Sequence, residues 1–138
     1  MASLQLISKQ DFEVLAEFRY QMRRFERFSE LAAQSEGITP QQYLLMLQIQ
    51  GTPGRDWATV GELAERLQMK HHGAVALVSR CETQDLVVRK VDQTDRRRVR
   101  VHLTARGLLL VQRLATLHQA QLESLNGVFE VPRMDPIK

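Results

Sequence analysis

Basic side chains are concentrated in one short part of this 138-residue chain, on both sides of a polar turn. Positions 89 to 106 hold seven of them, opposed only by Asp92 and Asp95: Arg89, Lys90, Arg96, Arg97, Arg98, Arg100 and Arg106. Two valine-rich segments flank the turn, a pattern that predicts a β-hairpin with arginines at its tip. Such a tip fits a narrow groove of duplex DNA, where guanidinium groups meet phosphates and an enhanced negative potential. The alternative is a solvated surface loop, the usual place of a charge run.

The charge of the chain is unevenly distributed, although the net charge is only +3. Residues 59–106 hold ten Lys and Arg against six Asp and Glu, and the remaining residues hold nine against ten. A basic excess confined to one segment favours a surface that binds a polyanion over a generally basic protein.

The composition excludes several classes of protein. The length corresponds to one domain with a sizeable core. No apolar run reaches the roughly eighteen residues of a membrane-spanning helix. Residues 1–9 lack the basic and apolar regions of a secretory signal, and a single cysteine cannot form an internal disulfide. We therefore expect a cytoplasmic protein.

Two long helices are predicted towards the two ends of the sequence. The first spans about residues 9–33, and its apolar residues recur at steps of three or four along one stripe: Phe12, Leu15, Phe18, Met22, Phe25 and Phe28. The last begins after a threonine N-cap, Thr104, and reaches about Phe129. The tail from Val131 to Pro136 contains two prolines and is expected to be irregular.

Three shorter helices are predicted between them. The helix at about 40–50 is expected to bury Tyr43, Leu44 and Leu47. A capping box formed by Thr59 and Glu62 begins a short helix. After a brief turn, a further helix runs from about 71 to 84, and its inward residues are Ala74, Leu77, Val78 and Cys81. Two short helices joined in this way form a helix-turn-helix, and the basic hairpin follows directly.

This order of elements resembles the MarR family of bacterial transcriptional regulators. The segment from Asp92 to Gly107, with a Leu-Thr-x-x-Gly entry to the last helix, is similar to the wing signature of that family. The segments 60–67 and 71–87 are similar to its helix-turn-helix. The resemblance covers about residues 9–129.

The resemblance implies a mainly α fold with a small β-hairpin wing (α+β), arranged as one winged helix-turn-helix domain over residues 1–138. It assigns about 9–35 and 104–129 to dimerisation helices and about 40–103 to the winged helix-turn-helix lobe. It also implies a homodimer and, as in many relatives, a small phenolic or anionic effector that releases DNA. The sequence departs from the family pattern in two respects. Asp85 stands where relatives often have glycine, and only about ten residues follow the last helix, so we expect a reduced C-terminal dimer interface.

Two groups of residues are predicted to contact DNA. On the helix at 71–84 and the turn before it, the outward residues are those closest to the base edges: Lys70, His71, His72, Val75, Ala76, Ser79 and Arg80. The group in the wing is Arg96, Arg97, Arg98 and Arg100. The resemblance implies that Asp95 pairs with Arg97 and fixes the tip while Arg96 enters the minor groove. Arg98 and Arg100 are expected to face phosphates on the returning strand.

The other residues that could form a redox, metal or catalytic site are not expected to do so. Cys81 lies on the apolar face of its helix, which favours packing over a redox switch. His71 and His72 are adjacent and point about 100° apart on a helix, so no metal site is expected. Neither a cofactor nor a catalytic constellation is expected, and we predict a protein without enzymatic activity. Aromatic or cationic residues of the early helices are candidates for an effector pocket: Arg19, Tyr20, Tyr43 and Trp57.

The sequence thus predicts a homodimeric repressor that binds a palindromic operator in double-stranded DNA, associates with the bacterial nucleoid when bound, and responds to a small molecule. The alternative, from a different class, is a winged-helix module for protein–protein contact with no affinity for duplex DNA. The basic bias of residues 59–106 favours the first hypothesis.

Overall fold

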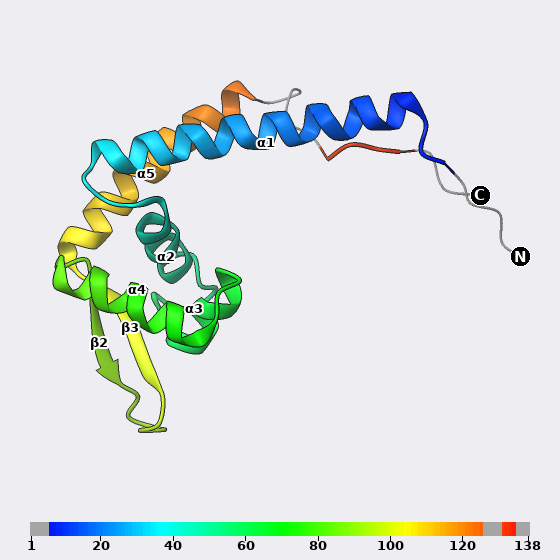
Figure 1. Ribbon diagram of the computed structural model, residues 1–138. Helices are drawn as coiled ribbons and strands as arrows, with labels where there is room; N and C mark the ends of the chain where they lie inside the picture. The colour runs from blue at the N-terminus through cyan, green and yellow to red at the C-terminus, as the bar shows by residue number, and fades with distance from the viewer. Residues whose placement is uncertain (1–5, 126–130, 135–138) are drawn as a thin grey trace, which may run out of the picture.

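The computed structural model describes residues 6–125 and 131–134. Within them the elements follow the order α1 (Lys9–Ser35), α2 (Pro40–Gln50), β1 (Trp57–Thr59), α3 (Val60–Arg66), α4 (His71–Thr83), β2 (Val87–Val91), β3 (Val99–Leu103) and α5 (Ala105–Ser124). Figure 1 shows α1 and α5 side by side, the hairpin β2–β3 at the opposite end of the molecule, and α2 between them. The predicted winged helix-turn-helix with long flanking helices is confirmed.

Helix starts are set by side-chain caps. Ser8, Thr39 and Thr59 each accept a hydrogen bond from the third helical N–H, and the residue at that position returns a bond to the cap backbone. Thr104 caps α5 by accepting from the N–H of Gly107. Each cap stabilises its helix by about 1 kcal/mol. The caps predicted at Thr59 and Thr104 are confirmed.

The sheet has three antiparallel strands in the order β1-β3-β2. The sequence predicted only the hairpin, in which Val87 pairs with Leu103 and Val91 pairs with Val99. The additional strand β1 pairs Trp57 with His102 and Thr59 with Arg100. Three residues are too few to show the alternation by which a strand is recognised.

The core lies between α2, α3, α4, the sheet and the first half of α5. The inward set predicted for α4 is buried as expected: Ala74, Leu77, Val78 and Cys81. The prediction for α2 was partly wrong, because Tyr43 is buried but Leu44 is 40% exposed and Leu47 is half-buried. Helix α2 packs against both α4 and α5, and Leu44 and Leu47 face a cavity.

Much of the apolar stripe of α1 is uncovered in the single chain. Phe12 is 58% exposed and Leu15 is 39% exposed. Figure 1 shows that the first turns of α1 project beyond α2 to α5. The described part of α5 ends at Ser124, so the predicted continuation to Phe129 lies outside the described residues. Residues 131–134 have no regular structure, as predicted, and positions 135 and 136 again lie outside the described residues.

The turn after α4 packs tightly against the start of α5. Asp85 has a φ of 58°, the left-handed conformation that aspartate tolerates, so the expected turn is preserved without glycine. The Thr104 hydroxyl donates to the carbonyl of Asp85 at 2.6 Å, and the Thr104 amide donates to the carbonyl of Leu86 at 3.1 Å. A Cβ at Gly107 would lie 2.1 Å from the same Leu86 oxygen. The threonine and glycine of the Leu-Thr-x-x-Gly segment are therefore required by the close packing of this turn against α5.

Candidate nucleic-acid interface

Helix α4 presents its polar and small residues to solvent while its apolar face packs into the lobe. The predicted contact residues Lys70, His71, His72, Val75, Ala76 and Arg80 are exposed, and Ser79 is half-buried. The hairpin extends beyond α4, away from α1 (Figure 1). An exposed helix face beside a projecting hairpin is the arrangement with which winged helices enter adjacent grooves of DNA.

The N-terminus of α4 lacks the side-chain cap that begins the other helices. Its N-cap is Lys70, whose side chain makes no hydrogen bond to the helix. The N–H groups of the first turn therefore receive no acceptor from the N-cap side chain. They carry the positive end of the helix dipole, which suits a phosphate oxygen.

Arg89 braces α4 against the wing. Its Nη2 donates to Ser79 Oγ at 2.7 Å and to the carbonyl of Val75 at 3.1 Å, and its Nη1 donates to Glu82 Oε1 at 2.8 Å. In the sequence analysis Arg89 was one of the basic side chains of the hairpin, but in the structure its guanidinium group is hydrogen-bonded to α4. Ser79 is engaged by the same contact, so it is less available to a base than the sequence predicted.

The wing turn is held by two carboxylates. Asp95 Oδ1 accepts hydrogen bonds from the Arg97 amide and Nε, each at 3.1 Å, which is the pairing expected for the tip. Asp92 Oδ1 accepts from the Thr94 amide at 2.9 Å and the Thr94 hydroxyl at 2.7 Å. These hydrogen bonds lower the pKa of both carboxyls. The turn is therefore ordered by ionised groups, with Arg96 and Arg98 exposed at its surface.

Arg100 does not lie where the sequence placed it. Its Nε is 3.3 Å from Oδ2 of Asp92, a side chain that is 1% exposed, and its Cζ is 3.8 Å from the ring centroid of Trp57. Arg55 approaches the same ring at 4.0 Å. The expectation that Arg100 faces phosphates is corrected for this reason. The sequence did not reveal this position, because the strand that carries Trp57 was not predicted.

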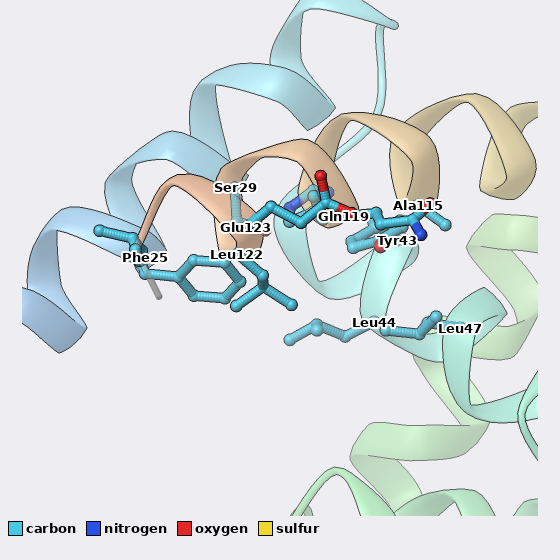
Figure 2. A pocket seen from close by; sticks show the side chains of 11 residues that line it. Phe25, Ser29, Tyr43, Leu44, Leu47, Ala115, Gln119, Leu122 and Glu123 are labelled. Carbon is cyan, nitrogen blue, oxygen red and sulfur yellow. The ribbon is translucent and has the colours of Figure 1, made fainter. Parts of the chain in front are cut away.

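A cavity of about 630 Å³ lies between α1, α2 and α5 (Figure 2). It is lined by Tyr43, Leu44, Leu47, Phe25 and Leu122, among others. Of the candidate effector residues, only Tyr43 belongs to it. Arg19 and Tyr20 are exposed on α1, and Trp57 lies in β1 beneath its two arginines. The four candidates therefore do not form one site.

His118 is a residue of this cavity that the sequence did not single out. It is 7% exposed and stacks on Tyr43, with ring centroids 4.9 Å apart and an angle of 15°. Its Nδ1 is 2.6 Å from the carbonyl of Leu114, and its buried Nε2 has no hydrogen-bond partner within the described part of the chain. The sequence could have identified His118 by its spacing of four residues from Leu114, which places both side chains on the same buried face of α5.

The remaining chemistry-bearing residues are accounted for by packing. Cys81 is fully buried, and burial raises the pKa of its thiol to about 11, so the packing interpretation is confirmed. Burial, followed by the nearby Lys90, lowers the pKa of His102. Among the described residues, no group of three or more His, Cys, Asp or Glu could hold a metal ion. No helix in the same residues is long and apolar enough to cross a membrane.

The comparisons with known proteins agree with this geometry. A family model described as the MarR family matches residues 36–98, which include α2, the helix-turn-helix and most of the wing. This match places residues 36–98 of the chain in the MarR family.

Two curated proteins similar to this chain are named as transcriptional regulators. The chain is 33% identical over 102 residues to a putative transcriptional regulatory protein for the hcr operon of Thauera aromatica, covering 74% of the chain and 58% of the relative. It is 35% identical over 72 residues to the HTH-type regulator YsmB of Bacillus subtilis strain 168, covering 52% and 47%. The chain thus spans about half the length of the curated relatives it matches.

Solved structures of MarR-family proteins share the fold. AbsC from Streptomyces coelicolor superposes with a TM-score of 0.78 at 20% identity, covering 94% of this chain and 86% of AbsC. MepR of Staphylococcus aureus, in a complex with DNA, superposes with a TM-score of 0.69 at 20% identity, covering 88% and 85%. At these identities the likeness establishes the winged-helix fold.

Proposed function

We propose that this MarR-family chain forms a homodimeric repressor that binds a palindromic operator in double-stranded DNA. The observation that carries the proposal is the exposed face of α4 beside a wing that is braced by Arg89 and carries Arg96 at its surface. In this interpretation α4 reads base edges in the major groove, with His72, Val75 and Ala76 nearest to them. Arg96 enters the adjacent minor groove.

The uncovered apolar stripe of α1 supports the homodimer. Phe12, Leu15 and, on α5, Leu117 and Leu122 are 39–58% exposed. An exposed stripe of this size on two neighbouring helices fits a two-fold interface with a second copy. In this division α1 and α5 carry dimerisation and residues 40–103 form the DNA-binding lobe of a single domain.

Sedimentation at micromolar concentration tests the assembly. We expect a dimer for the native chain and a shift towards monomer for Phe12→Asp, because a carboxylate would be buried at the interface. Lys9→Asp, on an exposed position of the same helix, is the control and should remain dimeric. Full affinity for a palindrome by a monomeric protein would refute this arrangement.

A salt titration of DNA binding tests the assignment of the wing. Arg96→Ala should weaken binding to specific and non-specific DNA together and reduce the salt slope by about one per subunit, because one fewer cation meets the backbone and groove. His72→Ala should instead reduce discrimination between operator variants and leave the slope nearly unchanged. Arg23→Ala, on the exposed side of α1, removes the same charge away from the DNA face and should alter neither property.

The same titration separates the proposal from a protein–protein module. A native chain that shows no salt-dependent shift of duplex DNA selected from a random pool would exclude the regulator. An unchanged salt slope for Arg96→Ala would place the wing away from DNA and return its arginines to the solvated surface.

We further propose that the cavity between α1, α2 and α5 receives the effector. Its volume of about 630 Å³ lies within the range of small-molecule sites, and the Tyr43–His118 stack forms a flat aromatic wall. Its lining includes Glu123 but neither Lys nor Arg among the described residues. The resemblance implies a phenolic or an anionic effector, and this lining favours the uncharged phenolic one.

Competition between DNA and a matched ligand pair tests the effector site. A phenol should release DNA from the native chain at lower concentration than a benzoate of similar size, since the carboxylate would face Glu123 without a cation. Leu44→Trp should block release by filling the cavity while leaving DNA affinity intact. Equal release by phenol from the native chain and from Leu44→Trp would exclude the cavity.

A further inference from the structure

The one tryptophan of the chain lies at the centre of a series of contacts that joins the wing to the start of α3. On the wing side, Arg100 lies over the Trp57 ring at 3.8 Å and pairs with Asp92 at 3.3 Å. On the other side, Arg55 lies over the same ring at 4.0 Å and pairs with Glu62.

The carboxylates at the two ends of this series, Asp92 and Glu62, each hold a segment of backbone in place through hydrogen bonds. Asp92 accepts from the Thr94 amide and hydroxyl, and its own amide donates to the carbonyl of Arg98 at 3.0 Å, so it closes the wing turn. Glu62 accepts from the Thr59 amide at 3.0 Å and from the Thr59 hydroxyl at 2.9 Å, so it closes the cap of α3.

The register of the sheet explains how these side chains meet. Trp57 pairs with His102 and Thr59 pairs with Arg100, so Trp57 and Arg100 lie on the same face as diagonal neighbours on adjacent strands. A guanidinium over an indole ring is the strongest common form of cation–π contact. The end of the hairpin next to the wing turn is thereby attached to α3, the helix that packs on α4.

We infer that Trp57 is a positioning residue for DNA binding: through Arg100 and Asp92 it holds the wing at a fixed angle to α4, so that Arg96 and the exposed face of α4 engage DNA together. The inference rests on the proposed function. Trp57 itself is not proposed to contact DNA. Its effect on DNA affinity depends on Arg96. A residue that only stabilised the fold would affect DNA affinity whether or not Arg96 were present.

Amide hydrogen exchange tests the attachment without DNA. In Trp57→Leu, exchange of the Asp92 and Thr94 amides should accelerate on the order of 10-fold, because the wing turn loses the contact that holds Arg100 against Asp92. Trp57→Phe keeps a ring for both guanidinium groups and should restore most of the protection. Ile49→Val, a fully buried change in α2, lowers stability without touching the series and should leave these two amides unchanged.

A double-mutant cycle tests the consequence for DNA. Trp57→Leu should weaken operator binding on the order of 10-fold in the native background and by less than about 2-fold in the Arg96→Ala background. Arg100→Lys keeps the charge beside Asp92 but loses the planar guanidinium that lies over the ring. If Trp57→Leu does not fold, Arg100→Lys takes its place in the cycle, with the same losses expected.

The two experiments fail in different ways. Unchanged exchange in both Trp57→Leu and Arg100→Lys would overturn the attachment, whatever the chain binds. Additive losses in the cycle would overturn positioning through the wing and leave Trp57 a stabilising residue. Accelerated exchange in a chain that does not bind duplex DNA would refute the proposed function, with the attachment of the wing confirmed.

Discussion

Substitution of Gly107 by alanine tests whether the start of α5 is packed as closely as the structure indicates. Gly107 is the third residue of α5, and a Cβ there would lie 2.1 Å from the carbonyl oxygen of Leu86 and 3.1 Å from its carbonyl carbon. Real Cβ contacts do not approach backbone oxygen so closely, so either α5 or the turn at Asp85 must move. That movement also disturbs the Thr104 amide bond to Leu86.

The expected loss follows from three contributions. Over-packing of a dense site costs about 1–3 kcal/mol. Weakening the Thr104 hydrogen bond costs about 1 kcal/mol. Alanine returns about 1 kcal/mol through its higher helix propensity. The free energy of unfolding should therefore fall by about 2 kcal/mol, which corresponds to a decrease in Tm of roughly 6–8 °C for a chain of this length.

Urea unfolding at one fixed protein concentration measures this loss, and Gly61→Ala is the matched control. Gly61 also lies in the first turn of a helix, but a Cβ there meets nothing within 4 Å. The control should be unchanged or more stable by up to about 1 kcal/mol. If Gly107→Ala and Gly61→Ala unfolded at the same urea concentration, the close approach of Leu86 would be wrong.

Two further predictions concern titratable groups of the lobe. Cys81 is fully buried and its pKa is raised to about 11, so a thiol reagent should label it only as fast as the lobe unfolds. Cys81→Ala should lower the free energy of unfolding by about 1 kcal/mol. Rapid labelling with loss of DNA binding would contradict the packing. The pKa of His102 lies below its usual 6.5, so the unfolded chain takes up this proton first and stability should fall as the pH drops below about 6.5. His102→Gln should reduce the loss of stability between pH 7.5 and 5.5, measured by urea unfolding, and an identical loss in both proteins would refute the assignment.

Local chemistry allowed most of the helices to be predicted from the sequence. The bounds of α2 and the starts of α1, α3, α4 and α5 match the predictions, because capping residues and apolar spacing act within a single turn of helix. The inward face of α4 was equally accessible, since Ala74, Leu77, Val78 and Cys81 recur at helical spacing. The pairing of Asp95 with Arg97 came from the family resemblance, and its two partners are only two residues apart.

The predictions failed where a side chain finds its partner across a long sequence separation. Arg100 was assigned to phosphates from the family resemblance, whereas its position depends on Trp57, which lies in a strand of only three residues. Arg89 was likewise counted as surface charge, although its contacts are with α4, ten and fourteen residues away. In both cases the residue type was compatible with two roles, and only tertiary structure distinguishes them.

The same distinction separates the basic residues of the hairpin into two classes. Arg89, Arg97 and Arg100 each pair with a carboxylate and hold the wing in shape. Arg96 and Arg98 are exposed on the turn, and among the described residues they enter no ion pair that the structure records. A count of positive charge therefore overstates the number of cations that face DNA. Half or more of the arginines in this segment maintain the shape that allows the others to reach a groove, so substitutions in the two classes should differ in kind: loss of Arg96 should change the salt dependence of binding, and loss of Arg100 should change the order of the wing.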